Sequence, residues 1–447
     1  MNTYKTPGAF VEEVAKLPPS VAEVATAIPA FIGYTKENNT GFTEVTPVRI
    51  TSLLEYIALF GTAAVIPITV DVTEDGSGVV TAISSTFNKP RYTMYYHMQM
   101  YFANGGGPCY IVSVGAINEA MVGDGDILAT GFTVLRYDEP TLLVFPDAVN
   151  LGDSDGLYGL YSDAMSYASY QKNLFVIMDC FADNVDVLRN SIGTSGLKYG
   201  AVYYPSLNTT LGYVYDDAQV TVKWNSPTGV LLSTLSTSNN ARYHIVKQYV
   251  ESLTITLNPS AAIAGVYASV DRTRGVWKSP ANVSLNMVKG VTKHISDEDQ
   301  KGLNVDPVGG KSVNAIRSFT GKGTLVWGAR TLDGNSNEWR YISVRRFFNM
   351  VEDSVKKATE SFVFEPNDAN TWTRVQGMIE NYLLTQWRAG ALQGAKPEHA
   401  FYVAVGLGKT MTALDILEGR MIVEIGMAAV RPAEFIVLRF SHMMAQS

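Results

Sequence analysis

The last residues of the chain, RPAEFIVLRFSHMMAQS, contain the feature that most limits how it can fold, an apolar segment from Glu434 to Phe440. Alternate side chains of a β-strand point to opposite faces. Both faces of this predicted strand are largely apolar, because it contains Phe435, Ile436, Val437, Leu438, Arg439 and Phe440. An unpaired strand of this kind aggregates unless something covers it. Two interpretations follow: it pairs within its own chain, or it is lent to a neighbouring subunit.

The composition agrees with a chain that buries much of its surface. At 447 residues it is long enough for two or three domains of roughly 100–200 residues each. Charged residues make up 17%, against a usual share of about 25%, and hydrophobic residues 46%. The net charge of -7 and the scattered Lys and Arg residues argue against a nucleic-acid-binding protein.

The N-terminus predicts no export signal. Glu12 and Glu13 stand where a signal peptide would be apolar, so synthesis and folding in the cytoplasm are expected. No apolar run approaches the ~20 residues that span a bilayer, which argues against direct membrane insertion. Cys109 and Cys180 lie beside apolar, strand-like sequence and are predicted to be buried free thiols.

The first half of the chain alternates predicted strands and helices. AIPAFIGYT is typical of a strand, and SLLEYIALFG of a helix that ends at Gly61. A hairpin is predicted around EDGSG within 66–90. A helix, a glycine-rich turn and a buried strand follow in TMYYHMQMYFANGGGPCYIVSVG. The alternation continues through TLLVFPD, YSDAMSYASYQ and NLFVIMDC, which predicts a parallel sheet.

The second half changes character twice. Thr209 to Leu257 is rich in Ser, Thr and Asn, and is interpreted as an insertion or loop-rich flap. A compact α+β unit follows, with long helices and the strands HAFYVAV and GRMIVEIGMAAV. The fold class is therefore a mixed α/β and α+β architecture. The predicted divisions are an N-terminal arm (1–20), an α/β domain (21–278) with insertions near 66–90 and 209–257, an α+β domain (279–430) and a C-terminal segment (431–447).

Two stretches partly match the phosphate-binding loop G-x-x-x-x-G-K-[ST]. In VGLGKTM, Gly408, Lys409 and Thr410 match its end, but Val403 takes the place of its first glycine. In GGKS the first glycine is replaced by Val305. The first stretch also lies between two predicted strands, without the following helix that such a loop needs. Both are interpreted as glycine-containing loops.

The patterns for metal binding and catalysis are also incomplete. LGDSDGLYGLYS has Asp153 and Asp155 in calcium-loop spacing, but Leu151 and Ser162 take two ligand positions, so a turn is predicted. The histidines are dispersed, at His97, His244, His294, His399 and His442. HISDEDQ predicts a helix start at Ser296. No catalytic residue, cofactor or metal is predicted, and the chain is not expected to be an enzyme.

Several motifs together carry a resemblance to a known family. These are SPANVSLN, DEDQKGLN, NAIRSFTGKGTLVWGARTL, WRYISVRRFFNMVEDS, FVFEPND, WRAGALQG, EHAFYVAVG and RPAEFIVLRF, together with YKTPGAFVEEV and YFANGGGPCYIVSV nearer the N-terminus. In order and spacing the sequence resembles the tail sheath proteins of contractile phage tails and related contractile injection particles. It departs from the family's usual pattern at Gly408 and Lys409, where similar proteins often have a Cys-Asp-type turn.

The resemblance implies that residues 279–430 are an inner domain that faces a tube, and that 431–447 is a C-terminal arm. Both ends of the chain would reach into different neighbours and complete a small sheet in that inner domain. One lent strand would be Phe10, Val11, Glu12, Glu13 and Val14, and the other Phe435 to Phe440. Adding a strand to another protein's sheet uses main-chain hydrogen bonds for affinity and alternate side chains for specificity. Because each contact is head-to-tail, the polymer is expected to be open and helical.

The resemblance further implies a mechanical function. Copies of the chain, in stacked rings, would surround an inner tube and contract to drive it through a target envelope. Further partners would be baseplate and terminal cap proteins, and no nucleic acid. The location would be a virion tail or a released or cell-bound phage-tail-like particle. Two alternatives remain: a static fibre linked by donated strands, and a nucleotide-binding enzyme with a phosphate-binding loop.

Overall fold

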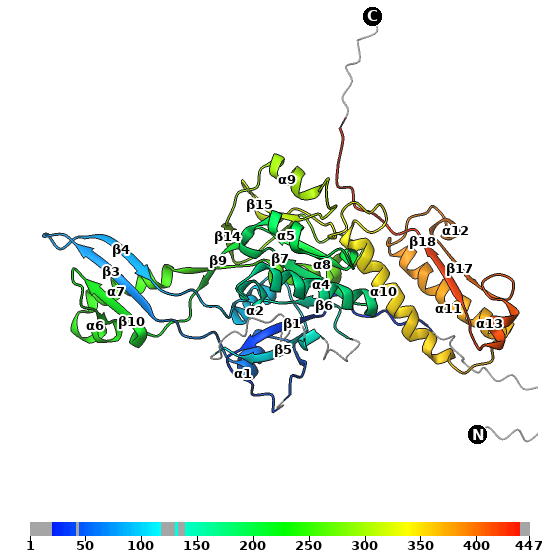
Figure 1. The fold of residues 1–447 in the computed structure, drawn as a ribbon, viewed down its shortest axis with the longest axis horizontal. Helices are drawn as coiled ribbons and strands as arrows, with labels where there is room; N and C mark the ends of the chain where they lie inside the picture. The colour runs from blue at the N-terminus through cyan, green and yellow to red at the C-terminus, as the bar shows by residue number, and fades with distance from the viewer. Residues whose placement is uncertain (1–19, 42–43, 118–129, 133–138, 439–447) are drawn as a thin grey trace, which may run out of the picture. The chain divides into compact units, whose positions relative to one another are not determined.

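The structure is a computed structural model that describes residues 20–41, 44–117, 130–132 and 139–438. Its described residues form two compact units (Figure 1). The large unit contains described residues from 24 to 350 and from 431 to 438, and the small unit contains 20–23 and 351–430. This division falls inside the range predicted as one inner domain, 279–430. The predicted domain boundaries stay predictions.

A mixed sheet of nine strands is the centre of the large unit. In order across the sheet the strands are β13 (Val283–Ser284), β16 (Gly323–Val326), β15 (Asn314–Phe319), β8 (Gly200–Tyr204), β7 (Phe175–Asp179), β6 (Leu142–Val144), β1 (Pro29–Thr35), β5 (Cys109–Ala116) and β2 (Val48–Ile50). All neighbours from β15 to β5 are parallel, which confirms the predicted parallel sheet. The outer strands β2, β16 and β13 are antiparallel to their neighbours.

Helices cover both faces of this sheet. Side chains of α4 (Ser154–Gln171) and α5 (Val185–Ser191) contribute to the core on one face. Those of α1 (Leu53–Phe60), α2 (Met94–Ala103) and α8 (Ser260–Arg274) contribute to the core on the other. Because both faces are covered, the central strands are continuously apolar, as buried parallel strands usually are.

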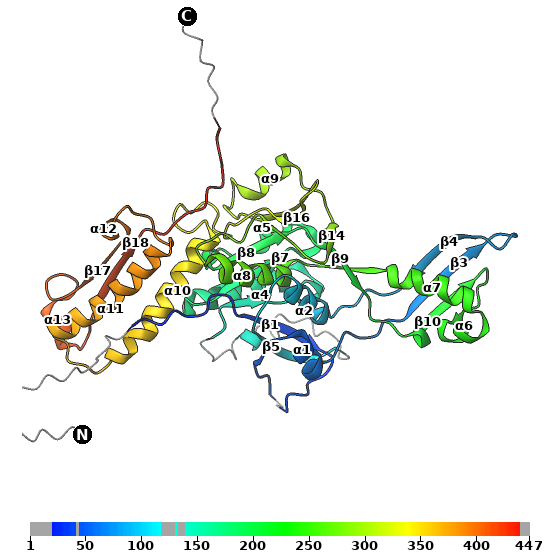
Figure 2. The same ribbon diagram turned by 180° about the vertical axis from the view of Figure 1, so that it is seen from behind.

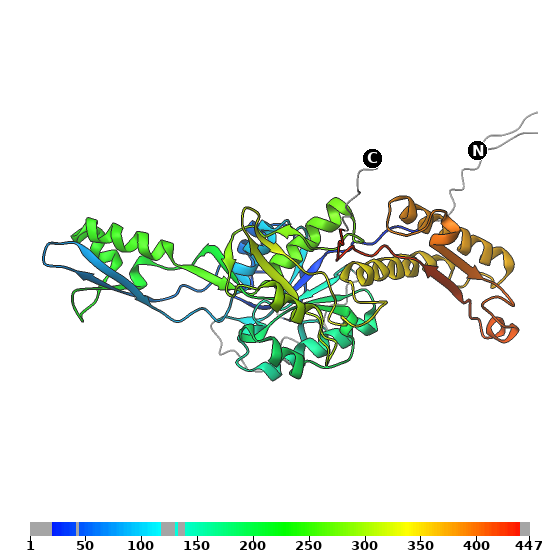
Figure 3. The same ribbon diagram turned by 90° about the horizontal axis from the view of Figure 1, so that it is seen from above.

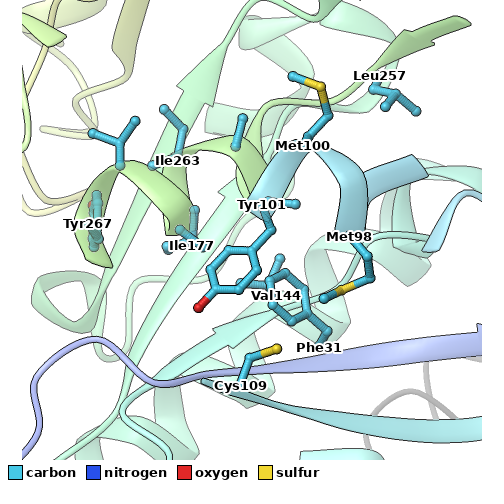
Figure 4. Packing of buried hydrophobic residues seen from close by; sticks show 14 of the residues in the cluster. Phe31, Met98, Met100, Tyr101, Cys109, Val144, Ile177, Leu257, Ile263 and Tyr267 are labelled. Atoms are coloured by element: carbon cyan, nitrogen blue, oxygen red, sulfur yellow. The ribbon is translucent and has the colours of Figure 1, made fainter. Parts of the chain in front are cut away.

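The packing between α2, α8 and the sheet shows how closely this core is filled (Figure 4). The rings of Phe31 on β1 and Tyr101 on α2 meet edge to face, with 4.9 Å between their centroids. Cys109 lies in the same core and Cys180 in the core on the opposite face, and both are buried free thiols, as predicted.

A buried carboxylate joins α8 to the end of β7. Asp179 accepts hydrogen bonds from the backbone N of Ser260 at 2.9 Å and from its Oγ at 2.6 Å. Burial raises the pKa of Asp179 to about 7, and the hydrogen bonds from Ser260 offset this only in part. The carboxyl group therefore holds a proton far more tightly in the folded chain than in water.

A three-stranded antiparallel sheet adjoins this core. It consists of β12 (Thr254–Leu257), β9 (Leu207–Gly212) and β14 (Val288–Val291). Gly212 of β9 pairs with Thr254 of β12, so the chain leaves and re-enters this sheet at neighbouring points. The helix predicted to begin at Ser296 is α9 (Asp297–Asn304), and its capping box with Asp299 confirms that prediction.

The segment between β9 and β12 forms a lobe with a second, distant segment. The two-segment lobe consists of β11 (Val230–Leu231), β10 (Val220–Trp224), β3 (Ile68–Glu74), β4 (Val80–Thr86), α6 (Leu232–Ser238) and α7 (Asn240–Ser252). β3 and β4 form the predicted hairpin, and β3 pairs in parallel with β10. In Figure 3 the hairpin lies beside the two helices.

The interpretation of 209–257 as a loop-rich flap is therefore wrong. This range contains two helices and two strands of the lobe's four-stranded sheet, and Val220, Val222, Val246 and Val250 are buried. Some of its Ser and Thr residues occupy solvent-facing positions of α6, β10 and β12. Their abundance gave the range a loop-like composition, which explains the wrong prediction. The apolar residues that pack against it include Val70 and Val72, which come from the distant hairpin.

The small unit packs helices against a two-stranded sheet. Its elements are the end of α10 (Ile342–Thr359), α11 (Ala369–Arg388), α12 (Pro397–Ala400), β17 (Phe401–Val405), α13 (Ala413–Leu417) and β18 (Val423–Met427). The buried residues of α11 recur at helical spacing, with Val375, Ile379 and Leu383 on one face. Figure 2 shows β17 and β18 beside α11.

Candidate functional site

In the described part of the C-terminal apolar segment, residues 435–438 are exposed and pair with no described strand. Phe435, Ile436, Val437 and Leu438 are 72–79% exposed. Among the described residues, none of the sheets includes this segment, which leaves the fold as extended chain in Figure 1. Its last two candidate residues, Arg439 and Phe440, lie outside the described residues. Residues 435–438 therefore pair with no described strand of their own chain, so the described residues give no support to the first interpretation.

Glu434, the first residue of this segment, is held by a cluster of donors on the large unit. The carboxylate of Glu434 accepts hydrogen bonds from Arg330, through Nε at 2.9 Å and Nη2 at 2.7 Å. The hydroxyl of Tyr341 lies 3.2 Å from the same carboxylate, and Nδ2 of Asn304 lies 3.3 Å from it. A bidentate arginine–carboxylate pair of this kind is strong and directional.

Arg330 is itself fixed to the central sheet. Its backbone N donates a hydrogen bond to Oδ1 of Asn314 at 2.7 Å, and its backbone O accepts one from Nδ2 of Asn314 at 2.8 Å. Nδ2 of Asn314 also donates to the backbone O of Val202, 3.1 Å away on β8. Hydrogen bonds therefore run without a break from Glu434 to β15 and β8.

The sheet of the small unit has an open edge. β17 and β18 are antiparallel, and the backbone N of Ala428 donates to the O of Ala400, which places the even-numbered residues of β18 toward β17. The backbone groups of the odd-numbered residues, Val423, Ile425 and Met427, then point to the outer edge. No strand within the described ranges pairs along that edge.

The candidate N-terminal strand, Phe10 to Val14, lies outside the described residues. The described part of the chain begins at Ser20. The carboxylate of Glu23 accepts a hydrogen bond from Nε2 of Gln386 on α11, 2.7 Å away. The described chain next to the arm therefore begins on the small unit, which also has the open edge of β18.

The loop containing Gly408, Lys409 and Thr410 cannot hold a phosphate as it stands. A phosphate-binding loop needs free backbone N–H groups. Here the amides of residues 409, 410 and 411 all donate to the O of Gly406, and that of Gly408 donates to the O of Met411. The hydroxyl of Thr410 donates to the O of Ile422. The loop is a closed turn between β17 and α13, so the prediction that no helix follows it is wrong.

The GGKS stretch is closed by a carboxylate. Asp306 accepts hydrogen bonds from the backbone N of Gly309 and of Lys311, each at 3.1 Å. The Nζ of Lys311 donates to the backbone O of Arg189 and of Ile192. A negative charge thus occupies the place where a phosphate would bind, and the lysine faces the protein instead.

Two of the remaining candidate ligands have structural surroundings that the structure describes. Asp153 begins α4 by accepting a hydrogen bond from the backbone N of Gly156, so this stretch is the start of a helix and the predicted turn is wrong. His97 is buried on α2, and burial lowers its pKa to about 4, so its ring is neutral near pH 7. In the described ranges, no group of three or more His, Cys, Asp or Glu residues could hold a metal ion. No helix of that part of the chain is long and apolar enough to cross a membrane.

The sequence did not identify Arg330, Tyr341 or Asn314 as parts of this site. They lie far from Glu434 along the chain, and no local motif connects them. The available signals were a polar asparagine before two apolar residues at the start of the strand NAIRSF, and an arginine in the largely apolar stretch VWGARTL. A buried polar residue needs a partner, but its identity does not follow from the sequence.

Comparison with known proteins gives one consistent result. A family model described as the phage tail sheath C-terminal domain matches residues 335–442. The tail sheath protein of Burkholderia phage BcepMu is 26% identical over 257 residues, which cover 55% of this chain and 50% of that protein. The chain spans half or less of the length of the curated tail sheath proteins it matches.

Two solved structures match over almost the whole chain. One is the PVC sheath complex of an extracellular contractile injection system in its contracted state, which is 32% identical, with 99% of this chain and 98% of that chain covered and a TM-score of 0.67. The other comes from the baseplate of the anti-feeding prophage and is 34% identical, with 99% and 100% covered and a TM-score of 0.68.

Proposed function

The chain belongs to the sheath proteins of contractile phage tails and contractile injection systems, and from that premise we propose how it assembles and acts. The subunit polymerises helically around an inner tube, in stacked rings that begin at a baseplate and end at a cap protein. The polymer then shortens and drives the tube through a target envelope. The observation that carries this proposal is the exposed apolar segment 435–438 on a chain that also has an open sheet edge at β18.

The physical basis of assembly is the exchange of strands. An exposed apolar segment is unfavourable in water, and an open edge leaves backbone groups without protein partners. When one copy places its segment 435–440 along the β18 edge of another, both deficits are removed and a ladder of main-chain hydrogen bonds forms. The N-terminal strand, residues 10–14, would add a second connection to a different copy.

Contraction needs a polymer with two stable arrangements. Lent strands keep neighbouring copies joined while the packed bodies rotate, so the energy can come from better packing between subunits after the change. No nucleotide or other cofactor is used in this mechanism. The two closed loops, at 406–411 and 306–312, support that view, because their amides are already occupied.

The comparisons favour one particle type. The likeness to injection-system sheaths extends over the whole chain, whereas the matched curated phage proteins share only part of their length with it. We therefore propose a headless injection particle rather than a phage tail. Electron microscopy of the purified particle would settle this, since a capsid at one end would contradict it, and a thin solid fibre would support the static alternative.

Truncation tests the strand exchange. We expect a chain ending at Glu434 to fold and to stay soluble, because the cores of both units are intact, but to form no long cylinders. Its matched control ends at Phe440 and keeps the whole candidate strand, so it should assemble like the parent. Sedimentation and negative-stain imaging measure both. Cylinders of normal length from the chain ending at Glu434 would contradict the proposed exchange.

A further inference from the structure

The hydrogen bonds around Glu434 lie where the exposed part of the segment begins. Upstream, Nη1 of Arg431 donates to the backbone O of Asn337 at 2.8 Å. Residues 431–434 are thus attached to the large unit, while the next four side chains are 72–79% exposed. The chain changes from fixed to exposed within a single residue.

The attachment is built as an interior contact. The side chain of Arg330 is 5% exposed and that of Glu434 is 20% exposed. Nη1 of Arg330 also donates to the backbone O of Asn304 at 3.0 Å. A buried charge that loses its partner is strongly unfavourable, so the pair resists separation much better than a surface ion pair does.

We propose that Arg330 and Glu434 form a clamp that anchors the C-terminal arm, so that the pull of a second copy of this chain on the lent strand reaches the nine-stranded sheet. The path runs from Glu434 through Arg330 to Asn314 on β15 and Val202 on β8. This inference rests on the proposed function, because it assumes that residues 435–440 are lent.

The clamp also sets the reach of the arm. If Glu434 were released, residues 431–434 would join the free segment and add about 13–14 Å of extended length. A longer, looser arm presents its strand in many more positions, and ordering it on a neighbour costs more conformational entropy. The clamp therefore acts as a positioning device for a strand whose own hydrogen bonds are made elsewhere.

The first experiment measures the arm in the unassembled chain. Because both native cysteines are buried, spin labels can be attached selectively at Lys301→Cys, on the exposed side of α9, and at Ile436→Cys. The distance distribution between the labels should be narrow in the parent background and should broaden with Glu434→Gln. The matched control is Asp297→Asn, which breaks the more exposed Arg317–Asp297 pair, 2.8 Å long, in the same unit. It should leave the distribution unchanged.

The second experiment measures assembly without labels. The subunit concentration needed for polymer to form, measured by sedimentation, should rise at least tenfold with Glu434→Gln and less than twofold with Asp297→Asn. Tyr341→Phe removes only one donor to Glu434 and should give a smaller rise, which keeps the test valid if Glu434→Gln fails to fold. An unchanged distance distribution or an unchanged threshold would overturn the clamp.

The two proposals fail in different ways. If the chain ending at Glu434 still forms normal cylinders, the lent strand is wrong and the clamp has no role in assembly. If that truncation abolishes cylinders while Glu434→Gln and Tyr341→Phe assemble at the parent's concentration, the strand is lent but the clamp does not position it.

Discussion

At the scale of single residues, carboxyl groups shielded from solvent connect one element of this chain to another. Asp179 connects the end of β7 to the start of α8 through Ser260, and Glu434 connects the C-terminal arm to Arg330. The two differ in how charge is balanced. Glu434 has a cation as its partner, whereas Asp179 has only neutral donors from Ser260, so burial dominates its titration.

Asp179 makes folding stability depend on pH. Its pKa is raised to about 7 in the folded chain, from an ordinary value of 3.8, so the folded state keeps a proton that the unfolded state releases. The stabilisation is fully present below pH ~4 and is lost as the pH rises toward ~7, at up to about 1.4 kcal/mol per pH unit.

We therefore expect Asp179→Asn, which cannot ionise, to gain stability relative to the parent as the pH rises from 5 to 7. Urea unfolding of the two unassembled chains at a series of pH values measures the difference in free energy of unfolding. Other titrating groups are shared by the two chains and cancel in that difference. A difference that stays constant across this range would show that Asp179 does not titrate there.

At the scale of elements, the direction of each N–H on β18 decides what the strand can accept. Even-numbered residues bond to β17, and odd-numbered ones face outward. Proline removes one N–H, and it is tolerated on an edge strand where that N–H faces solvent. Ile425 is such a position, and its side chain is half-buried.

We expect Ile425→Pro to fold as the parent does but to lose polymer formation, because the added strand would meet a missing donor and a ring at the middle of the edge. Ile425→Ala also removes the isoleucine side chain but keeps the backbone N–H, so this variant should assemble. Circular dichroism checks the fold, and sedimentation checks the polymer. Equal assembly of the two variants would mean that this edge receives no strand.

Local patterns in the sequence predicted most individual elements. The start of α9 at Ser296, the end of α1 at Gly61 and the hairpin around EDGSG are confirmed, because caps and turns depend on a few adjacent residues. The parallel sheet followed from strand–helix alternation. The apolar terminal segment marked the candidate site, because its composition shows that it needs a partner, whereas its exposure is seen only in the structure.

Pairing between distant segments could not be predicted in this way. β3 and β10 are adjacent in one sheet although about 150 residues separate them, and nothing in either segment names the other. The same holds for Arg330 and Glu434. Propensity describes what a segment can form, whereas these contacts depend on which surfaces the rest of the fold brings together.

At the scale of the whole molecule, the two-segment lobe is a unit that neither of its segments can form alone. Its core joins Ile68, Val70 and Val72 of the hairpin to buried valines of β10 and α7. The ends of the second segment meet where Gly212 pairs with Thr254, so a short turn could replace it.

We expect replacement of 214–252 by a short glycine-rich turn to make the chain insoluble, because the hairpin would keep its exposed apolar face. Replacing 66–90 as well in the same chain should restore solubility, because both segments that form the core of the lobe would then be absent. The soluble fraction after expression measures both. If the single replacement is as soluble as the double one, the two segments do not depend on each other.

The donor segment and the open edge are different surfaces of one chain, and this makes the proposed polymer directional. In a finite stack, every interior copy both gives and receives a strand. One end must then present β18 edges without an added strand, and the other must present apolar strands without a neighbouring edge to pair with. The two ends are chemically distinct, so a protein that stops growth at one end must supply a strand, and a protein at the other must supply an edge.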